Sequence, residues 1–305
     1  MQSNLNIFLI SDNNYVPYLA TTIASICYNT KAFCNFYVLN GGISEENQNN
    51  VCELKKQFNN FSIDFIKVNT DKFFKNFQLP PRIPYSTYSR FLVQVLKPEL
   101  DKALCLDTDI VLLGDIAELY NINMENFAIA AMPELFAENG VNEERKHRLG
   151  LASNHKYFNC GILMMDIKKW TEQDIVKKLF DIAIKCKDKI KTCDQDVINM
   201  YFDNNNYYPL EQRYNYLTQN FSFFKAHNYI LRHYNGVIKP WHIHPDIKED
   251  TRLEFMNDKD NFWKYAKMTP FYDKLVADTK YKTDTDLRKF LVYKLMQERK
   301  NGTAK

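Results

Sequence analysis

The stretch KALCLDTDIVLL, residues 102–113, decides the fold. It is a dense apolar run that nevertheless contains two carboxylates, Asp107 and Asp109. Apolar runs of this kind are typical of a strand that is buried in a parallel sheet. Successive strand residues point to opposite faces, so we expect Asp107 and Asp109, separated only by Thr108, to point the same way. The preceding ALCL segment places the pair at the end of the strand. In parallel sheets this is the edge where ligands bind.

The carboxylate pair has two interpretations. Two like charges in an apolar setting repel each other and resist desolvation, and a divalent cation would remove both penalties. Hard oxygen ligands favour magnesium, manganese or calcium over softer metals. Alternatively, one Asp caps the next helix and the other is solvated, and the Asp-Xaa-Asp pattern alone does not decide between the two. An EF-hand loop is excluded because Val111 and Gly114 stand at the wrong offsets.

Strand-like and helix-like segments alternate along the rest of the chain. Before the central stretch, we predict strands at 6–11, 35–42 and 62–68, with helices at 15–29, 44–58 and 86–96. After it, we predict strands at 126–134 and 157–167, a long helix at 168–189 and a shorter one at 194–202. The βαβαβ order predicts an α/β fold with a mixed, largely parallel central sheet.

Composition excludes several classes of protein. The chain has 305 residues, 45% hydrophobic and 25% charged, which is typical of a soluble globular protein with a substantial core. A net charge of +3 gives no indication of nucleic-acid binding, and we expect none. Seven cysteines, an odd number without a CxxC pair, indicate free thiols in a reducing, cytoplasmic compartment. No apolar run has transmembrane length and no secretory signal is visible.

A second group of polar residues lies in RHYNGVIKPWH, residues 232–242. His233 could complete a metal site, Gly236 permits close backbone approach, and Lys239 could neutralise a phosphate. The chain has only 8 glycines and no glycine-rich phosphate loop, so phosphates would have to be held by a metal and isolated donors. The alternative interpretation is a surface loop with a core histidine. A binding role requires the segment to fold back onto Asp107 and Asp109, whereas a surface loop does not.

Two shorter motifs have both structural and functional interpretations. In CDQDVIN, Asp194 and Gln195 begin a helix, where acidic residues complement the helix dipole. In SDNNY, a helix N-cap explains one of Asp12, Asn14 and Tyr15 but not all three. The remaining residues of SDNNY could bind a nucleotide through hydrogen bonds and ring stacking.

The end of the chain differs from the body. From Asp284 onward, apolar residues alternate with Arg and Lys at helical spacing, which predicts a basic amphipathic segment. It either packs on the body as a solvated helix or binds an anionic membrane surface. We divide the chain into a catalytic domain at 1–270 and this C-terminal segment at 271–305.

Taken together, the motifs resemble glycosyltransferase family 8, and within it the bacterial lipooligosaccharide galactosyl- and glucosyltransferases. The resemblance covers nearly the whole body in order. It runs through FLISDNNYVPYLATTIASI, FYVLNGGIS, TYSRFLVQVL, LCLDTDIVL, YFNCGILMMDIKKW, DQDVIN and HYNGVIKPWH. It implies a GT-A fold with a single nucleotide-sugar-binding domain, a UDP-hexose donor, Mn²⁺ or Mg²⁺, and retention of anomeric configuration. The implied acceptor is a glycan or lipid-linked oligosaccharide of lipopolysaccharide or lipooligosaccharide.

The resemblance also implies roles for individual residues. The metal ligands would be Asp107, Asp109 and His233, and the diphosphate would lie against Gly236 and Lys239. The remaining implied contacts to the nucleotide sugar are Ser11, Asp12, Asn14, Tyr15 (stacking on the base), Arg90, Thr108, Glu134, Asn159 and Asp194. Asp194 and Gln195 would flank the anomeric carbon as catalytic residues. Because family tails associate with membrane, the resemblance favours the inner face of the cytoplasmic membrane.

One departure from the family leaves the donor open. In the galactosyltransferases the segment matching AMPELFAE carries an Asp that helps to hold the donor sugar, and here that residue is Glu134. The longer side chain moves the carboxylate, so galactose and glucose both remain candidates. The segment 138–150 is expected to border the acceptor.

The reaction leaves further alternatives. Retention requires either same-face attack or double displacement, and we favour the former because Gln195 is a poor nucleophile, with Asp194 the fallback for a covalent route. A nucleotidyltransferase and a non-catalytic sugar-nucleotide-binding protein on the same fold are the two other functions considered.

Overall fold

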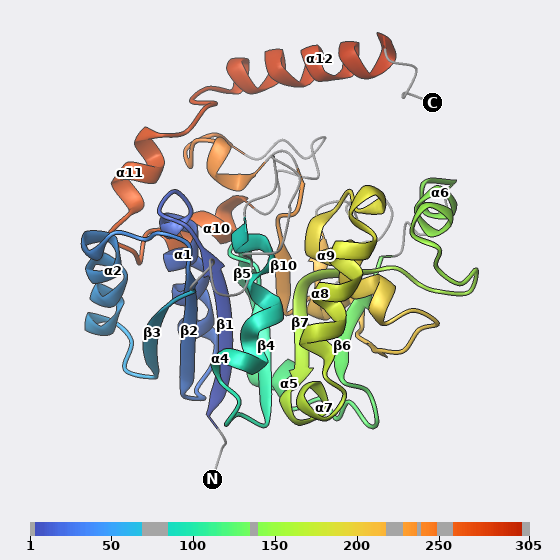
Figure 1. Ribbon diagram of the computed structural model, residues 1–305. Helices are drawn as coiled ribbons and strands as arrows, with labels where there is room; N and C mark the ends of the chain where they lie inside the picture. Colours follow the sequence, from blue (N-terminus) through green and yellow to red (C-terminus); the bar gives the residue numbers. More distant parts are fainter. Residues whose placement is uncertain are drawn as a thin grey trace.

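The computed structural model describes residues 4–68, 85–134, 140–217, 228–236, 239–248 and 259–300. Its centre is a seven-stranded sheet in the order β3-β2-β1-β4-β7-β6-β8 (Figure 1). The strands β1 (Leu5–Ser11), β2 (Cys34–Asn40), β3 (Phe61–Lys67) and β4 (Lys102–Leu106) are all parallel. The predicted parallel half of the sheet is therefore confirmed.

The other half of the sheet is mixed. β7 (Phe158–Asp166) runs antiparallel to both β4 and β6 (Ile129–Pro133), and β6 pairs in parallel with the short β8 (Tyr208–Pro209). β7 is buried along almost its whole length. The C-terminal ends of β1 and β4 lie at the same edge of the sheet, as the parallel pairing requires.

The central stretch 102–113 is not one strand, which corrects our reason for placing Asp107 and Asp109 together. β4 ends at Leu106, and β5 (Ile110–Leu112) belongs to a second, three-stranded sheet in the order β5-β10-β9. The Thr22 hydroxyl lies between the two strands, 3.0 Å from the carbonyl oxygen of Thr108 and 2.8 Å from that of Ile110. The two carboxylates therefore converge because the chain turns between sheets, and not because strand residues alternate.

The second sheet brings distant segments back to this turn. β10 (Leu231–His233) pairs antiparallel with β5, with His233 opposite Ile110, and in parallel with β9 (Tyr216–Leu217). The 3-10 turns η5 (Gln212–Tyr214) and η7 (Pro240–His242) flank these strands. This pairing brings residues 231–233 back to the end of β4.

The first helices differ from prediction mainly in type and length. α1 (Val16–Asn29) matches the predicted helix closely. The predicted helix at 44–58 is α2 (Glu45–Cys52) followed by η1 (Glu53–Lys56), and Ser44 caps it by accepting from Asn47 N. The predicted helix at 86–96 is mostly a 3-10 helix, η2 (Tyr85–Leu92), followed by α4 (Val93–Leu96).

The predicted long helix at 168–189 is wrong. The segment forms α7 (Ile167–Glu172), α8 (Ile175–Lys185) and η4 (Lys187–Lys189). Asp174, between the first two, has φ of 50°, in the left-handed region that ends a right-handed helix. The remaining helices are α5 (Ile116–Tyr120), α6 (Gly140–Leu149), α9 (Cys193–Tyr201), α10 (Lys259–Ala266), α11 (Tyr272–Ala277) and α12 (Asp284–Lys300).

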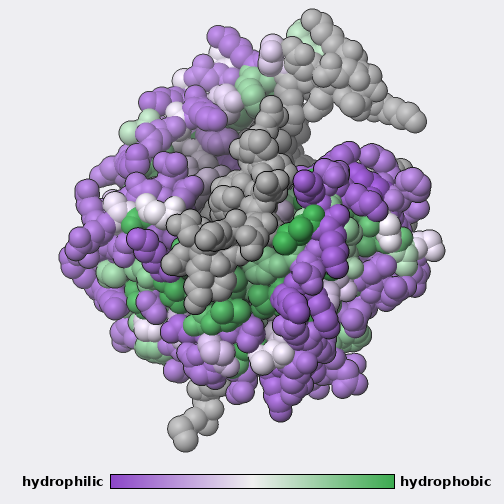
Figure 2. Space-filling view, viewed as in Figure 1, coloured by the Kyte–Doolittle hydropathy of each residue, from purple (hydrophilic) through white to green (hydrophobic). Residues whose placement is uncertain are grey.

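Two hydrophobic clusters fill the two faces of the main sheet. Ile7 and Leu9 of β1 point into a cluster with α1 and α10, whereas Phe8 between them points into a cluster with α8 and α9. The alternation follows from the two-residue period of a strand and gives a three-layer α/β architecture. Hydrophilic residues cover most of the outer surface in Figure 2. All seven cysteines lie within the described residues and are free.

The end of the chain packs against the body in part. Leu287 of α12 is buried in a small cluster with Ile243 and Ile247. Farther along, Val292, Tyr293 and Met296 are exposed, and α12 extends along the outside of the molecule (Figure 1). Among the described residues, none of the helices combines the length and apolarity that crossing a membrane requires.

Candidate active site

A cavity of about 240 Å³ opens at the C-terminal ends of β1 and β4. It is lined by Ile10, Ser11, Asp12, Tyr15, Arg90, Asp107, Thr108 and Asp109. Five of the residues that the resemblance assigned to the nucleotide sugar, together with Asp107 and Asp109 from the implied metal site, thus lie around one space. The location is the one that parallel α/β sheets use for ligands.

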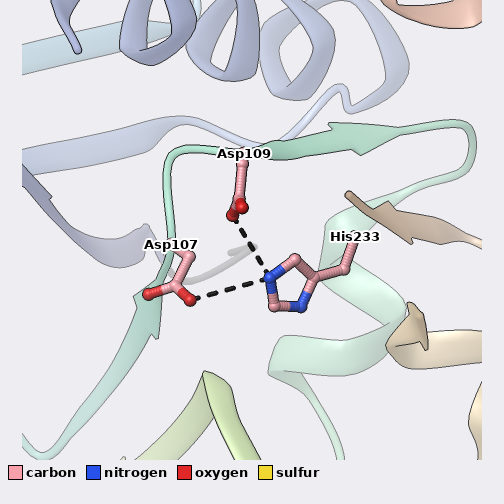
Figure 3. A group of neighbouring side chains, drawn as sticks. All are labelled: Asp107, Asp109 and His233. Carbon is pink, nitrogen blue, oxygen red and sulfur yellow. Dashed lines mark ion pairs between the residues drawn. The ribbon is translucent and has the colours of Figure 1, made fainter. Parts of the chain in front are cut away.

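Asp107, Asp109 and His233 form a candidate metal site beside this cavity (Figure 3). His233 Nε2 lies 3.2 Å from Asp109 Oδ1 and 3.6 Å from Asp107 Oδ2. One potential ligand atom of each residue lies within 4.8 Å of the others. His233 therefore lies against both aspartates, which is the condition that the sequence left open.

The surroundings of the three residues fit a divalent cation. His233 Nδ1 lies 3.0 Å from Asn215 Oδ1, which fixes the ring and leaves Nε2 facing the carboxylates. Gly161 of β7 leaves the space that this arrangement needs. A Cβ there would lie 2.2 Å from His233 Cε1 and 2.7 Å from Asp107 Oδ2. Two carboxylates and one imidazole suit Mn²⁺ or Mg²⁺.

Two cations of the protein itself flank the carboxylate pair. Lys239 Nζ lies 2.7 Å from Asp109 Oδ2, and Arg90 Nη2 lies 2.7 Å from Asp107 Oδ1. Burial alone would raise the pKa of Asp109, but His233 and Lys239 outweigh burial and hold that pKa well below its ordinary value. Asp109 is therefore ionised throughout the physiological range, ready to bind a cation.

Arg90 connects the metal site to Asp194. Its Nε lies 2.6 Å from Asp194 Oδ2, its Nη1 donates to the Cys160 carbonyl, and the side chain is almost fully buried. Burial raises the pKa of Asp194 to about 6 in spite of this ion pair. The helix-dipole interpretation of Asp194 is thus incomplete, because its carboxylate turns into the protein toward Arg90.

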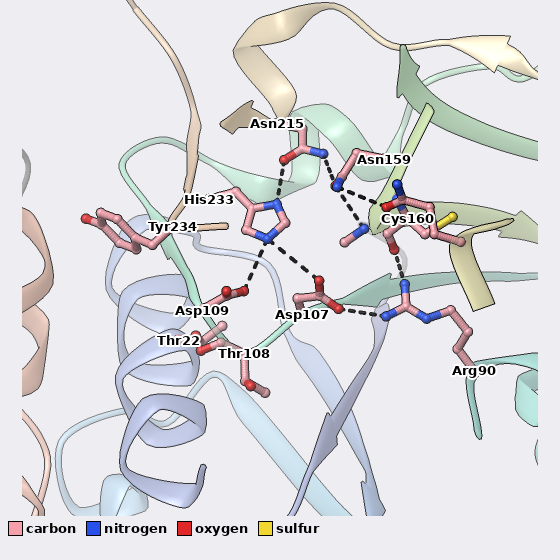
Figure 4. Close-up of polar contacts among 12 residues, drawn as sticks. Thr22, Arg90, Asp107, Thr108, Asp109, Asn159, Cys160, Asn215, His233 and Tyr234 are labelled. Atoms are coloured by element: carbon pink, nitrogen blue, oxygen red, sulfur yellow. Dashed lines mark hydrogen bonds and ion pairs between the residues drawn. The ribbon is translucent and has the colours of Figure 1, made fainter. Parts of the chain in front are cut away.

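The amide side chains of Asn159 and Asn215, drawn in Figure 4, connect Gln195 to the metal site. Gln195 Oε1 accepts from Asn159 Nδ2 at 3.2 Å and from Cys160 N at 3.1 Å. Asn159 Oδ1 accepts from Asn215 Nδ2 at 2.9 Å, and Asn215 in turn contacts His233. The amides join residues from β7, α9 and β10 into one polar network.

Within the SDNNY motif at the end of β1, Asp12 closes a turn and Tyr15 presents its ring at the cavity. Asp12 Oδ1 accepts from Asn14 N at 2.9 Å and from Tyr15 N at 3.0 Å, so that oxygen closes the turn before α1. Tyr15 is 43% exposed, and its ring makes an edge contact with Tyr18, which stacks on Trp241 with 4.0 Å between the ring centres. Tyr15 therefore offers an accessible ring at the cavity, supported by the turn η7. Asn14 is not among the lining residues.

The structure places the other predicted residues less directly. Gly236 is half-buried three residues beyond His233, and the next two residues lie outside the described part of the chain. Glu134 follows β6 and contacts Gln195 rather than the metal site. The expected acceptor border at 138–150 is described only from Gly140, as α6.

Sequence reasoning missed three residues that shape the site. Asn215 orients His233, Thr22 holds the turn between the aspartates, and Gly161 leaves the space beside them. Gly161 lies inside the YFNCG motif, where a glycine within a buried strand signals close approach of another group. Asn215 and Thr22 carry no such signal, because an isolated polar residue in a loop or helix has many ordinary uses.

Comparison with known proteins fits this arrangement. A family model described as Glycosyl transferase family 8 matches residues 6–244, which is most of the chain. The chain belongs to glycosyltransferase family 8. A putative glycosyltransferase of Haemophilus influenzae strain Rd is 32% identical to it over 254 residues, covering 78% of this chain and 73% of that protein. The lipopolysaccharide 1,2-glucosyltransferase of Escherichia coli strain K12 is 29% identical over 264 residues, covering 80% and 75%.

Solved structures support the fold of this family 8 chain. A crystal structure of the galactosyltransferase LgtC with donor and acceptor sugar analogues matches with a TM-score of 0.74 and 26% identity. The match covers 87% of this chain and 96% of LgtC. The predicted GT-A type α/β fold and the predicted family are both confirmed, and the chain is a glycosyltransferase with a candidate metal site.

Proposed function

We propose that this family 8 enzyme is a metal-dependent retaining hexosyltransferase, which moves galactose or glucose from a UDP-sugar to a glycan acceptor. The observation that carries the proposal is the convergence of Asp107, Asp109 and His233 beside a cavity that Tyr15 and Arg90 also line. The names of its relatives support a hexose donor and an acceptor related to lipopolysaccharide.

In this proposal the nucleotide end is bound by the β1 edge. Tyr15 stacks on uracil, while Ser11, Asp12 and Asn14 supply hydrogen-bonding groups around the uridine. Asp107, Asp109 and His233 would hold the cation, and Gly236 and Lys239 would lie against the diphosphate. A divalent cation in this place would neutralise the negative charge that develops on the departing diphosphate. The Lys239 ammonium supplies further positive charge at the same place.

The sugar would lie toward Arg90, Thr108, Asn159 and Asp194. Breaking the bond from C1 to the phosphate oxygen leaves an oxocarbenium-like sugar, and the acceptor hydroxyl forms the new bond on the same face. The departing phosphate oxygen takes the hydroxyl proton. A glutamine amide is a poor nucleophile, so we assign Gln195 to stabilising and positioning the sugar. The buried Asp194 is held by Arg90, which disfavours its use as a nucleophile.

A donor screen tests this function. Purified enzyme with Mn²⁺ and an oligosaccharide acceptor is given UDP-galactose, UDP-glucose and their N-acetyl analogues, and UDP release is measured. We expect release from one or both hexose donors, and loss of release when the metal is chelated. Pyrophosphate release from UTP would instead identify a nucleotidyltransferase. Binding of UDP-sugar without any hydrolysis or transfer would identify a non-catalytic protein.

We further propose that residues 271–305 form a membrane-associating segment, which would hold the enzyme on the inner face of the cytoplasmic membrane beside a lipid-linked acceptor. Exposed Val292, Tyr293 and Met296 on α12 lie close in sequence to exposed Arg288 and Lys289. Apolar and basic side chains together favour anionic lipid surfaces. Sedimentation with phosphatidylglycerol vesicles should exceed that with phosphatidylcholine vesicles, and an R288E/K289E variant should lose the difference. Equal sedimentation of wild-type enzyme with both would contradict the proposal.

A further inference from the structure

Glu134 has protein partners on both of its carboxylate oxygens. Oε1 accepts from Gln195 Nε2 at 3.1 Å, and Oε2 accepts from Arg145 Nη1 at 2.9 Å. The side chains of Arg145 and Glu134 are only 20% and 17% exposed, so water screens this ion pair less than it would on an open surface. Arg145 comes from α6, a helix that contributes no residue to the cavity lining described above.

The Gln195 amide is held in one orientation by these contacts. Its Oε1 receives two N–H groups, from Asn159 and Cys160, and its Nε2 donates to Glu134. An ionised carboxylate can only accept hydrogen bonds. A flipped amide would therefore place oxygen against the Glu134 carboxylate and N–H against two N–H donors. The Glu134 charge therefore acts together with the two N–H donors to fix which end of the amide faces which side of the site.

Arg145 in turn is held on a rigid support. Its guanidinium lies over the Tyr157 ring, 4.2 Å from the ring centre. The Tyr157 hydroxyl donates to Asp196 Oδ1 at 2.7 Å, and the Asp196 side chain is completely buried. Without Arg145, the flexible Glu134 side chain would lose its second anchor and could turn away from Gln195.

We propose that Arg145 is a positioning residue for sugar transfer, acting through Glu134 to fix the orientation of the Gln195 amide. This rests on the proposed function, in which Gln195 faces the positively charged sugar. An amide oxygen toward that charge stabilises it, whereas an N–H group toward it does not. Glu134 then acts on the sugar through Gln195. Its side chain is longer than that of the Asp in the galactosyltransferases, which lets one carboxylate reach both Arg145 of α6 and Gln195 of α9.

The kinetic test compares Arg145→Met with Lys146→Met. Both remove one positive charge from α6, but Lys146 contacts Glu143 and the Ser153 carbonyl instead of Glu134. We expect R145M to lower kcat about 10-fold to 100-fold, the scale of a misplaced catalytic group, with donor KM within about twofold of wild type. K146M should lower kcat by less than R145M does, because both residues lie in the segment expected to border the acceptor but only Arg145 contacts Glu134. Thermal unfolding of each variant separates positioning from loss of fold.

A double-mutant cycle asks whether Arg145 acts through Glu134. In an E134Q background the amide that replaces the carboxylate can donate as well as accept, so the restraint that Glu134 places on Gln195 is already removed. R145M should then change kcat by less than about twofold. Wild-type kcat in R145M, or an equal fall in the E134Q background, would overturn the proposal.

An NMR measurement decides the same point without turnover. In ¹⁵N-labelled enzyme the side-chain amide of Gln195, assigned by its absence in Q195A, should show two dispersed proton signals. In R145M they should move toward the positions of a free glutamine, and in K146M they should not. Unchanged signals in R145M would overturn the proposal even in an enzyme that released no UDP. A wild-type enzyme that released no UDP would defeat only the proposed function.

Discussion

Replacing Gly161 with Ala should disable metal binding while leaving the fold intact. The new Cβ would lie 2.2 Å from His233 Cε1, whereas ordinary contacts begin near 3.4 Å, so the ring must retreat by about 1.2 Å. The same Cβ would lie 2.9 Å from His233 Nδ1, the atom that Asn215 holds, and 2.7 Å from Asp107 Oδ2. Metal–ligand distances tolerate only about 0.2 Å. We therefore expect Mn²⁺ affinity to fall at least about 100-fold, or about 3 kcal/mol.

The assay follows the electron paramagnetic resonance signal of free Mn²⁺ as enzyme is added in the presence of UDP. Gly114→Ala is the matched control, because the three atoms nearest to its Cβ all belong to the Ile230 side chain, at 3.1 Å or more, and none belongs to a candidate ligand. G114A should bind Mn²⁺ like the wild type. Wild-type affinity in a folded G161A, or an equal loss in G114A, would refute the reasoning.

Three further predictions concern the donor and stability. Lys239→Met should lower kcat about 100-fold by removing positive charge from the leaving group, and wild-type kcat in a UDP-release assay would count against that role. Tyr15→Ala should raise donor KM about 10-fold through lost base stacking, with Tyr15→Phe near wild type, and an unchanged KM in Y15A would contradict the stacking. Burial would raise the pKa of Asp196, but hydrogen bonds from Thr192 and Lys191 outweigh it and lower the pKa below 3.8. This stabilisation is present above about pH 4 and lost as the pH falls through the lowered value, so Asp196→Asn should cost about 2 kcal/mol at pH 7 and converge with wild type in acid. Urea denaturation across the pH range measures the free energy of unfolding of D196N and of the wild type. A difference between them that stays constant with pH would contradict the lowered pKa of Asp196.

The parallel strands and the first helix could be predicted because apolar periodicity reports burial directly. β1 and α1 lie within about one residue of their predicted limits. The same periodicity carries no information on strand direction, so β7 could be predicted as a buried strand but not as antiparallel to β4. Breaks made by single backbone angles were also invisible, as at Asp174 with φ of 50°.

Some residues of the site could be predicted from the sequence, and others could not. Asp107, Asp109 and His233 could be proposed because their residue types suit a cation, yet the turn between two sheets that joins them is a tertiary feature. Asn215 and Arg145 act on other side chains and not on a ligand, so their residue types gave no signal. Their roles became visible only when the residue before β9 and the helix α6 were placed against the partners that they contact.

The central claim is that Asp107, Asp109 and His233 hold one divalent cation at the diphosphate of a UDP-sugar. Anomalous diffraction from a crystal grown with Mn²⁺ and UDP tests it directly. We expect a single strong peak within bonding distance of one oxygen of each aspartate, of His233 Nε2 and of the diphosphate. UDP bound in the cavity with no peak between these residues, or with the peak elsewhere, would contradict the claim.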